Sequence, residues 1–191
     1  MRIVINGCSG SGKTTLARAI AARCGIARLQ LDAEHWLPEW EERPDDEFKA
    51  RVAAFLREHE AWVIDGNYHR VLQDLVWPEA TMVVALDLPR WRVMSQIIWR
   101  SGRRVLTREE LYSGNTEGWR GLTSSDPEEN IVLWAWIKHA YYRELFARNE
   151  ADHRWRHIHF ERLKGRGQVD RWLEGFVDDW ESGRRQVHLG L

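Results

Sequence analysis

The sequence has few cysteines, no long apolar run and almost no net charge, and each of these absences excludes a class of protein. Its 191 residues include two cysteines, Cys8 and Cys24. This pattern predicts neither a disulfide framework nor a zinc site and is typical of a reducing cytosol. No apolar run is long enough to cross a bilayer, and the N-terminus lacks the pattern of a signal peptide. We therefore expect a cytoplasmic protein without membrane contact.

The formal net charge is −1, so the chain has no overall basic field of the kind that attracts nucleic acid. The sequence also lacks internal repeats and an obvious linker. With 43% hydrophobic and 30% charged residues it has an ordinary globular composition, apart from its twelve tryptophans. We expect one domain over residues 1–181 and a loose tail over residues 182–191.

A glycine-rich stretch near the N-terminus carries the clearest chemical signal. Residues 7–14 read Gly-Cys-Ser-Gly-Ser-Gly-Lys-Thr, which fits the phosphate-loop pattern G-x-x-x-x-G-K-[ST]. The motif requires a strand before it and a helix after it. Arg2–Asn6 has the composition of a short buried strand, and Thr14–Cys24 has helical periodicity and ends at Gly25. The loop therefore lies at a helix N-terminus, where the helix dipole favours anions.

This motif predicts ATP and Mg²⁺ as ligands. Lys13 is placed to reach the β- and γ-phosphates, and the Thr14 hydroxyl is placed to hold Mg²⁺. The cofactor-binding residues that we predict are Gly7, Ser9, Gly10, Ser11, Gly12, Lys13, Thr14 and Thr15. The alternative is a turn that binds nothing, which the strand–loop–helix context disfavours.

The rest of the chain alternates strand and helix patterns, which predicts an α/β fold with about five parallel strands flanked by helices. This is the three-layer organisation of P-loop NTPases. After the first unit, the strands that we expect are Ala27–Leu31, Trp62–Ile64, Thr81–Leu86 and Trp155–Phe160. The helices that we expect begin at Pro44 or Asp45 and span Arg90–Arg100, Asp126–Arg148 and Val169–Trp180. Asp32–Pro38 is expected as a loop, and residues 101–125, which lack a clean period, as a mobile lid.

Four acidic residues end or follow predicted strands, at the edge where open α/β sheets bind ligands: Asp32, Asp65, Asp87 and Glu161. Asp65 is the predicted partner of Thr14 at the metal, because it ends an apolar strand. Asp87 is the alternative, although the Leu-Pro step after it is also typical of a simple turn.

Several segments together resemble the adenylate-kinase-like P-loop kinases. They are the phosphate loop, the Leu31–Trp36 segment, Trp62–Tyr68 and Leu86–Arg90. Within that group the chain is most similar to the topology-modulation (FlaR-type) proteins, over almost its whole length. The resemblance implies a five-stranded core, an acceptor region after strands two and three, and a lid whose arginines close over the transferring phosphate. It assigns that role first to Arg100 and Arg104, with Arg103 and Arg108 nearby. It also implies that the Glu161–Gly167 loop holds adenine through its backbone.

The chain departs from adenylate kinase where that family binds its nucleotide acceptor. In place of a Pro-Arg step after the aspartate-glycine pair, it reads Asn67-Tyr68-His69-Arg70, and Arg51 is only a candidate acceptor arginine. Asp32 is a candidate catalytic residue that orients or deprotonates a hydroxyl acceptor, or else a simple cap. A phosphate acceptor needs cations and no base. The adenylate-kinase-like frame favours a phosphate acceptor and the missing Pro-Arg step favours a hydroxyl.

The leading expectation is phosphoryl transfer from ATP, with Mg²⁺, to a small molecule that is a nucleoside monophosphate or a hydroxyl metabolite. The alternatives are a regulatory ATP-binding protein that acts on DNA topology or a protein partner, and an ATPase without an acceptor. Trp36, Trp40 and Tyr68 are expected either to stack an acceptor ring or to fill a core. His157 and His159, predicted on one face of a strand, are expected to be structural and not metal ligands.

Overall fold

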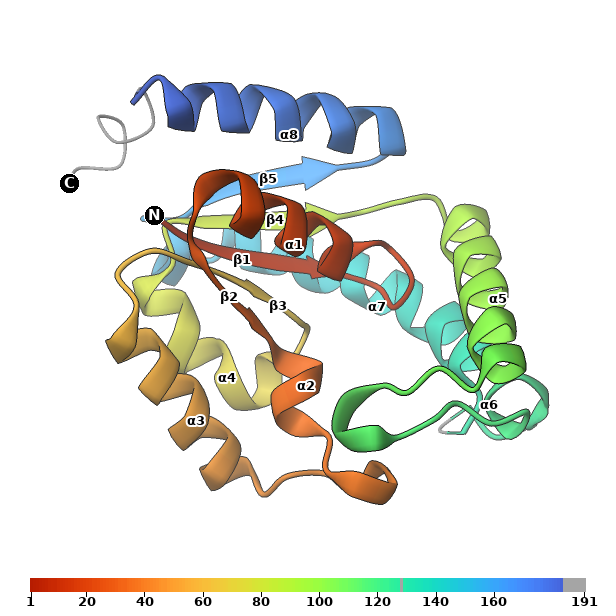
Figure 1. Ribbon diagram of the computed structural model, residues 1–191. Helices are drawn as coiled ribbons and strands as arrows, with labels where there is room; N and C mark the ends of the chain where they lie inside the picture. Colours follow the sequence, from red (N-terminus) through yellow and green to blue (C-terminus); the bar gives the residue numbers. More distant parts are fainter. Residues whose placement is uncertain (128, 184–191) are drawn as a thin grey trace.

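The computed structural model describes residues 1–127 and 129–183. It contains a parallel five-stranded sheet of order β2-β3-β1-β4-β5 (Figure 1). The strands are β1 Arg2–Gly7, β2 Ala27–Gln30, β3 Trp62–Asp65, β4 Met82–Leu86 and β5 His159–Leu163. Ile3 pairs with Val63 on one side and Met82 on the other, so β1 occupies the centre. The α/β fold with about five parallel strands is thus confirmed.

Helices cover both faces of the sheet, because alternate residues of its buried strands are apolar on both sides. The longer helices are α1 Lys13–Cys24, α3 Asp45–Glu58, α4 His69–Val76, α5 Arg90–Thr107, α7 Ile131–Ala151 and α8 Arg166–Glu181. Val4 packs into a core with α3 and α4, whereas Ile3 and Ile5 pack into a core with α1 and α8. A third cluster joins α5 to α7. Figure 1 shows α1 and α8 on one side of the sheet, with α3, α4 and α7 on the other.

Short elements complete the chain. They are α2 Leu31–His35, α6 Arg120–Thr123 and the 3₁₀ turns Pro38–Trp40, Trp77–Glu79, Tyr112–Gly114 and His153–Trp155. The sequence did not suggest α4. The expected loop at Asp32–Pro38 is wrong in its first half, because α2 begins at once after β2.

The irregular region is shorter than expected. Residues 101–107 continue α5, since Ser101 and Val105 extend the buried stripe that includes Ile97. What remains is residues 108–119, which we call the lid segment. It folds back on itself through a bridge between Glu110 and Thr116.

Two boundaries near the C-terminal half also differ. The expected helix start at Asp126 is wrong: α7 begins at Ile131, because the Asn130 side chain accepts hydrogen bonds from the backbone N–H groups of Val132 and Leu133 at 2.9 and 3.2 Å. The strand expected at Trp155–Phe160 instead spans His159–Leu163 as β5. Trp155 is buried, but it belongs to the 3₁₀ turn that precedes this strand. Glu161 therefore lies within β5 and His157 precedes it.

The single domain over residues 1–181 stays a prediction, and most of the expected tail, residues 184–191, lies outside the described residues. Among residues 1–127 and 129–183, no helix is both long and apolar enough to span a membrane.

Candidate active site

The phosphate loop joins β1 to α1 at the carboxyl edge of the sheet. Its backbone needs glycine: φ is +77° at Gly10 and +94° at Gly12, and a Cβ at Gly10 would lie 2.3 Å from Ile97 Cγ1. Gly12 occupies the N-cap of α1 and has no side chain that would cover the first amides of the helix. These amides and the positive end of the helix dipole are what a polyphosphate requires.

Lys13 lies at the first turn of α1 and reaches back over the loop. Its Nζ donates a hydrogen bond to the Cys8 carbonyl at 3.1 Å. Burial lowers the pKa of the Lys13 ammonium, and the negative charges of Asp32 and Asp65 oppose that shift. Lys13 is therefore close enough to both carboxylates to interact with them electrostatically.

The two predicted metal ligands are in contact. Thr14 Oγ1 donates a hydrogen bond to Asp65 Oδ2 at 2.7 Å, and Arg28 on β2 pairs with Asp65 Oδ1 at 3.3 Å. Asp65 is buried, and burial raises the pKa of its carboxyl. The alternative ligand, Asp87, pairs instead with Arg143 Nε of α7 at 2.9 Å. The geometry thus favours Asp65 as the acid beside Thr14.

The residue after Gly66 anchors the phosphate loop. The Asn67 side chain donates from Nδ2 to the Gly7 carbonyl at 2.6 Å and accepts from the Gly7 N–H at 3.2 Å. Asn67 thereby holds both backbone polar groups of the first loop residue. We refer to this pair of bonds as the Asn67 clamp.

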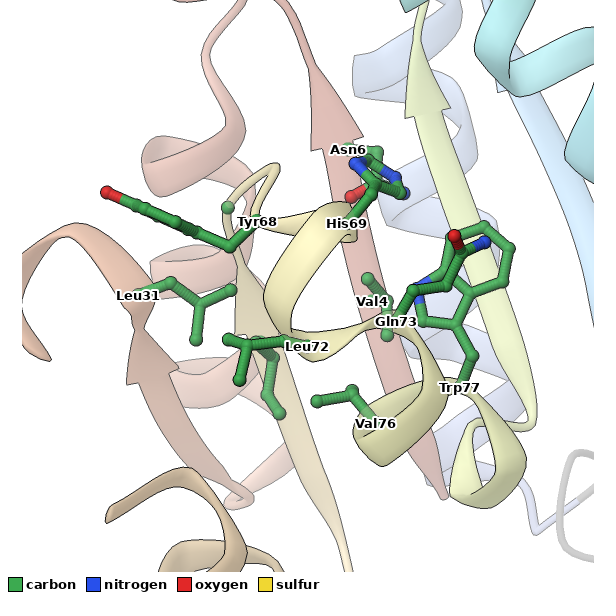
Figure 2. A pocket seen from close by; sticks show the side chains of 11 residues that line it. Val4, Asn6, Leu31, Tyr68, His69, Leu72, Gln73, Val76 and Trp77 are labelled. Carbon is green, nitrogen blue, oxygen red and sulfur yellow. The ribbon is translucent and has the colours of Figure 1, made fainter. Parts of the chain in front are cut away.

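His69 supports the clamp from α4. Its Nδ1 donates to the Asn67 carbonyl at 2.9 Å, and its Nε2 accepts from Asn6 Nδ2 at 3.2 Å, a pattern that only the neutral ring can make. Burial lowers the pKa of the His69 imidazole. Figure 2 shows His69 beside Asn6 at one end of a small pocket between α4 and the sheet, with Tyr68 pointing away from His69.

Asp32 lies in α2, directly after β2. Its Oδ1 accepts a hydrogen bond from the Tyr68 hydroxyl at 2.8 Å. The charge of Asp32 contributes to the pKa values of Lys13, Arg100 and Tyr112. Asp32 therefore lies within electrostatic reach of the loop lysine, an arginine of α5 and a tyrosine of the lid segment. We refer to the region between these four residues as the cleft.

The two predicted lid arginines have different surroundings. Arg100 Nη2 lies 3.4 Å from Ser9 Oγ, so this guanidinium reaches the phosphate loop. Burial and the neighbouring charge of Arg104 lower the Arg100 pKa. Arg104 instead pairs with Glu117 at 2.7 Å and Glu109 at 3.6 Å. The structure brings Arg100 to the loop and binds Arg104 to acids of the lid segment.

The lid segment lies against the region after β2. Ser113 Oγ donates to the Trp36 carbonyl at 2.7 Å, and Asn115 Nδ2 donates to the Leu37 carbonyl at 2.8 Å. Trp40 donates from its backbone to Asn115 Oδ1 at 3.1 Å and from its ring to the Thr116 carbonyl at 3.3 Å. These four bonds close the lid segment over residues 36–40.

The residues fit a nucleotide with Mg²⁺. Thr14 and Asp65 supply hard oxygen donors beside the loop, and Mg²⁺ is usually held by one or two such groups together with substrate phosphates. Ser11 Oγ is buried in the loop without a hydrogen-bond partner. A Cβ at Gly7 would lie 2.5 Å from that oxygen, so the cradle needs glycine there. Thr15, the last predicted nucleotide contact, is exposed at the start of α1.

Other predicted residues lie apart from this cleft. His159 and Glu161, both on β5, approach each other to 3.6 Å, and His157 approaches the Trp77 carbonyl at 3.3 Å. Trp36 and Trp40 meet edge to face, beneath the lid segment. Sequence reasoning missed Asn67 and Tyr112. Asn67 could have been found from the sequence, because it follows the aspartate-glycine pair at a strand end. Tyr112 has no such signal, because a tertiary contact with Gln30 brings it to this region.

The parallel sheet, its flanking helices and the phosphate loop between β1 and α1 define a P-loop NTPase fold. A family model described as an AAA domain matches residues 3–92, the segment that carries the phosphate loop, Asp32 and Asp65. Among solved structures, the chain is similar to a gluconokinase from Sinorhizobium meliloti 1021, with 24% identity over 77% of this chain and 96% of that one, at a TM-score of 0.41. No curated protein matches the chain.

Proposed function

We propose that this protein transfers a phosphoryl group from ATP to a small-molecule acceptor, with Mg²⁺. The observation that carries the proposal is the position of Asp32, which lies directly after β2 and interacts electrostatically with Lys13. A switch or simple ATPase needs the loop, the lysine and a metal-binding acid. A second carboxylate near the loop lysine, at another strand end, suits a site that binds a hydroxyl acceptor.

Each residue at the donor side has a defined task. Backbone amides of residues 7–14 hold the β- and γ-phosphates, and Lys13 neutralises charge on them. Arg100, held near Ser9, adds a second positive charge where negative charge develops. Thr14 and Asp65 would hold Mg²⁺, which would supply positive charge against the phosphate oxygens.

The proposal extends to the partners of the protein and to its location in the cell. We propose a small molecule as the only substrate besides ATP, no nucleic-acid partner and a cytoplasmic location. The near-zero net charge supports the absence of nucleic acid from the reaction.

The test compares ADP release by the wild type, Lys13→Ala and the control Lys49→Ala, each with ATP, Mg²⁺ and a panel of candidate acceptors. Lys49 is an exposed lysine of α3 and should be dispensable. We expect Lys13→Ala to lose turnover while its circular dichroism and melting transition stay close to those of the wild type. Wild-type turnover in Lys13→Ala would remove the proposal.

A further inference from the structure

We infer that the acceptor is an uncharged hydroxyl compound, such as a polyol or an unphosphorylated sugar, and that Asp32 receives its proton. This inference rests on the proposed function and concerns the acceptor half of the same cleft. It selects the hydroxyl alternative over a nucleoside monophosphate or other phosphate acceptor.

Cations on the acceptor side are already paired with acids of the chain. Arg51 Nε lies 2.6 Å from Glu34 Oε2, and Arg43 pairs with Glu47 while it donates to the Glu34 carbonyl. Arg28 pairs with Asp65, and Arg104 with Glu117. An acceptor phosphate would have to break such pairs, and each would leave a carboxylate close to the incoming dianion.

Two of the groups near Asp32, Tyr68 and Tyr112, are neutral phenols that suit a hydroxyl acceptor. Tyr112 of the lid segment accepts from Gln30 Nε2 at 2.7 Å, which leaves its own proton free to point elsewhere. Burial and the charge of Asp32 raise the pKa of Tyr112 to about 12, and they also raise the pKa of Tyr68. Both phenols therefore stay protonated near neutral pH. Tyr68 uses its proton on Asp32, and Tyr112 can donate a hydrogen bond to an acceptor without offering charge.

One oxygen of the Asp32 carboxylate accepts a hydrogen bond within the protein, and we assign the other to the acceptor. Tyr68 donates to Oδ1, which fixes the carboxylate and leaves Oδ2 for the acceptor. In the reaction, the acceptor oxygen forms a bond to the γ-phosphorus while the bond from that phosphorus to the β–γ bridging oxygen breaks. ADP leaves with that electron pair, and the hydroxyl proton passes to Asp32. A phosphate acceptor, already ionised, would have no proton to give.

The experiment uses acceptors of known chemistry: water, glycerol and AMP. Release of labelled phosphate and formation of labelled product from γ-labelled ATP are measured for the wild type, Asp32→Asn and the control Asp46→Asn, an exposed acid of α3. We expect Asp32→Asn to slow transfer to water and to glycerol by about 10²–10⁴-fold with ATP affinity unchanged. We expect the transfer rates of Asp46→Asn to match those of the wild type. We expect no transfer of phosphate to AMP by the wild type or by either variant.

Two results would overturn the inference: equal rates for the wild type and Asp32→Asn, or formation of ADP from AMP. The variant Lys13→Ala is measured in the same assay. It distinguishes a wrong acceptor assignment from a wrong proposed function. If Lys13→Ala abolishes turnover and Asp32→Asn does not, only the acceptor assignment is wrong. If Lys13→Ala turns over normally, the donor site itself is wrong.

Tyr68→Phe tests Asp32 without removing it, because Tyr68 acts as a positioning residue. Loss of its hydrogen bond should leave the Asp32 carboxylate less well oriented and so lower kcat for transfer to glycerol, with the KM for ATP unchanged. Tyr141→Phe, on the exposed side of α7, is the control. A wild-type kcat in Tyr68→Phe, or an equal change in kcat and in the KM for ATP, would contradict a positioning role of Tyr68 toward Asp32.

Discussion

Thr14 and Asp65 are joined by a 2.7 Å hydrogen bond between the first turn of α1 and the end of β3. The bond places a hydroxyl and a carboxylate side by side at the foot of the phosphate loop. Two elements that are distant in the sequence thereby form one oxygen-rich corner, and the chemistry of the site depends on their remaining together.

Asp65→Asn should weaken the response to Mg²⁺ far more than Asp87→Asn. Asparagine retains a polar contact with Thr14 but loses the charge that attracts the cation. We expect the Mg²⁺ concentration for half-maximal turnover to rise by about 10–100-fold. Asp87→Asn should leave it unchanged, because Asp87 pairs with Arg143. Turnover is followed during a Mg²⁺ titration after removal of metal with EDTA, and the reverse ranking would assign the metal to Asp87.

Asn67→Ala should weaken ATP binding by removing the Asn67 clamp. Two hydrogen bonds to Gly7 are lost, at about 1 kcal/mol each, so the loop no longer has a fixed first residue. We expect the KM for ATP to rise by roughly 10-fold, equivalent to about 1.4 kcal/mol. Gln168→Ala on α8 removes a comparable amide contact with Lys164 away from the loop. An equal KM effect in both variants would show that the clamp has no particular role.

The free energy of unfolding should fall as the pH drops below about 6.5, in part because of His69. Burial lowers the pKa of the folded-state imidazole, so the unfolded state binds more protons between that lowered pKa and the ordinary value near 6.5. His69 thus contributes stability above about pH 6.5 that is lost as the pH falls toward the folded-state pKa.

Urea unfolding of the wild type and His69→Gln at a series of pH values measures this term. The variant should show the shallower pH dependence, whatever its overall stability. His153→Gln, an exposed histidine of the turn before β5, should keep the wild-type slope. Identical slopes for the wild type and His69→Gln would show that His69 titrates as it does in the unfolded chain.

Asn115→Ala should loosen the lid segment. Asn115 is buried and holds both the Trp40 N–H and the Leu37 carbonyl, so its removal breaks two of the four bonds that close the segment. We expect faster amide exchange across residues 108–119 and a lower kcat/KM for the acceptor. Thr116→Ala is the matched control, since Thr116 contributes its backbone carbonyl and not its side chain. Slow exchange in Asn115→Ala would show that other contacts hold the segment.

A mobile lid also predicts a difference between states. Exchange across residues 108–119 should slow further when a nonhydrolysable ATP analogue and Mg²⁺ are added. Equal protection with and without the analogue would mean that the segment is a fixed wall of the cleft.

The sequence predicts the centre of the sheet well and its edge poorly. β1, β3 and β4 are compact apolar runs, because both of their faces are buried. β5 at the edge is mostly half-exposed, and its weak pattern led the prediction toward the apolar Trp155 nearby. The last turns of α5 were missed for a related reason: arginines and a glycine interrupt the pattern, although Ser101 and Val105 still face the interior.

Within the candidate site, local sequence patterns were sufficient to predict the residues of the donor side only. The spacing of glycines with Lys13 and Thr14 specifies a loop conformation, and Asp65 follows from its strand. The tyrosines near Asp32, one bonded to it and one bonded to Gln30, could not be predicted in the same way. Tyr68 and Tyr112 come from distant parts of the chain, and Tyr112 arrives because the lid segment packs on residues 36–40. Contacts between two loops leave no periodic trace in a sequence.

Cys8 has a consequence for how the protein tolerates oxidants. Its Sγ lies 3.5 Å from the Ala135 carbonyl on α7, and burial raises the pKa of the thiol. Since the thiolate is the form that reacts with peroxides and alkylating reagents, a buried and protonated thiol reacts slowly with both. The phosphate loop thus contains a cysteine at its second position that is shielded from redox chemistry, and catalysis should persist under oxidative conditions that modify exposed thiols.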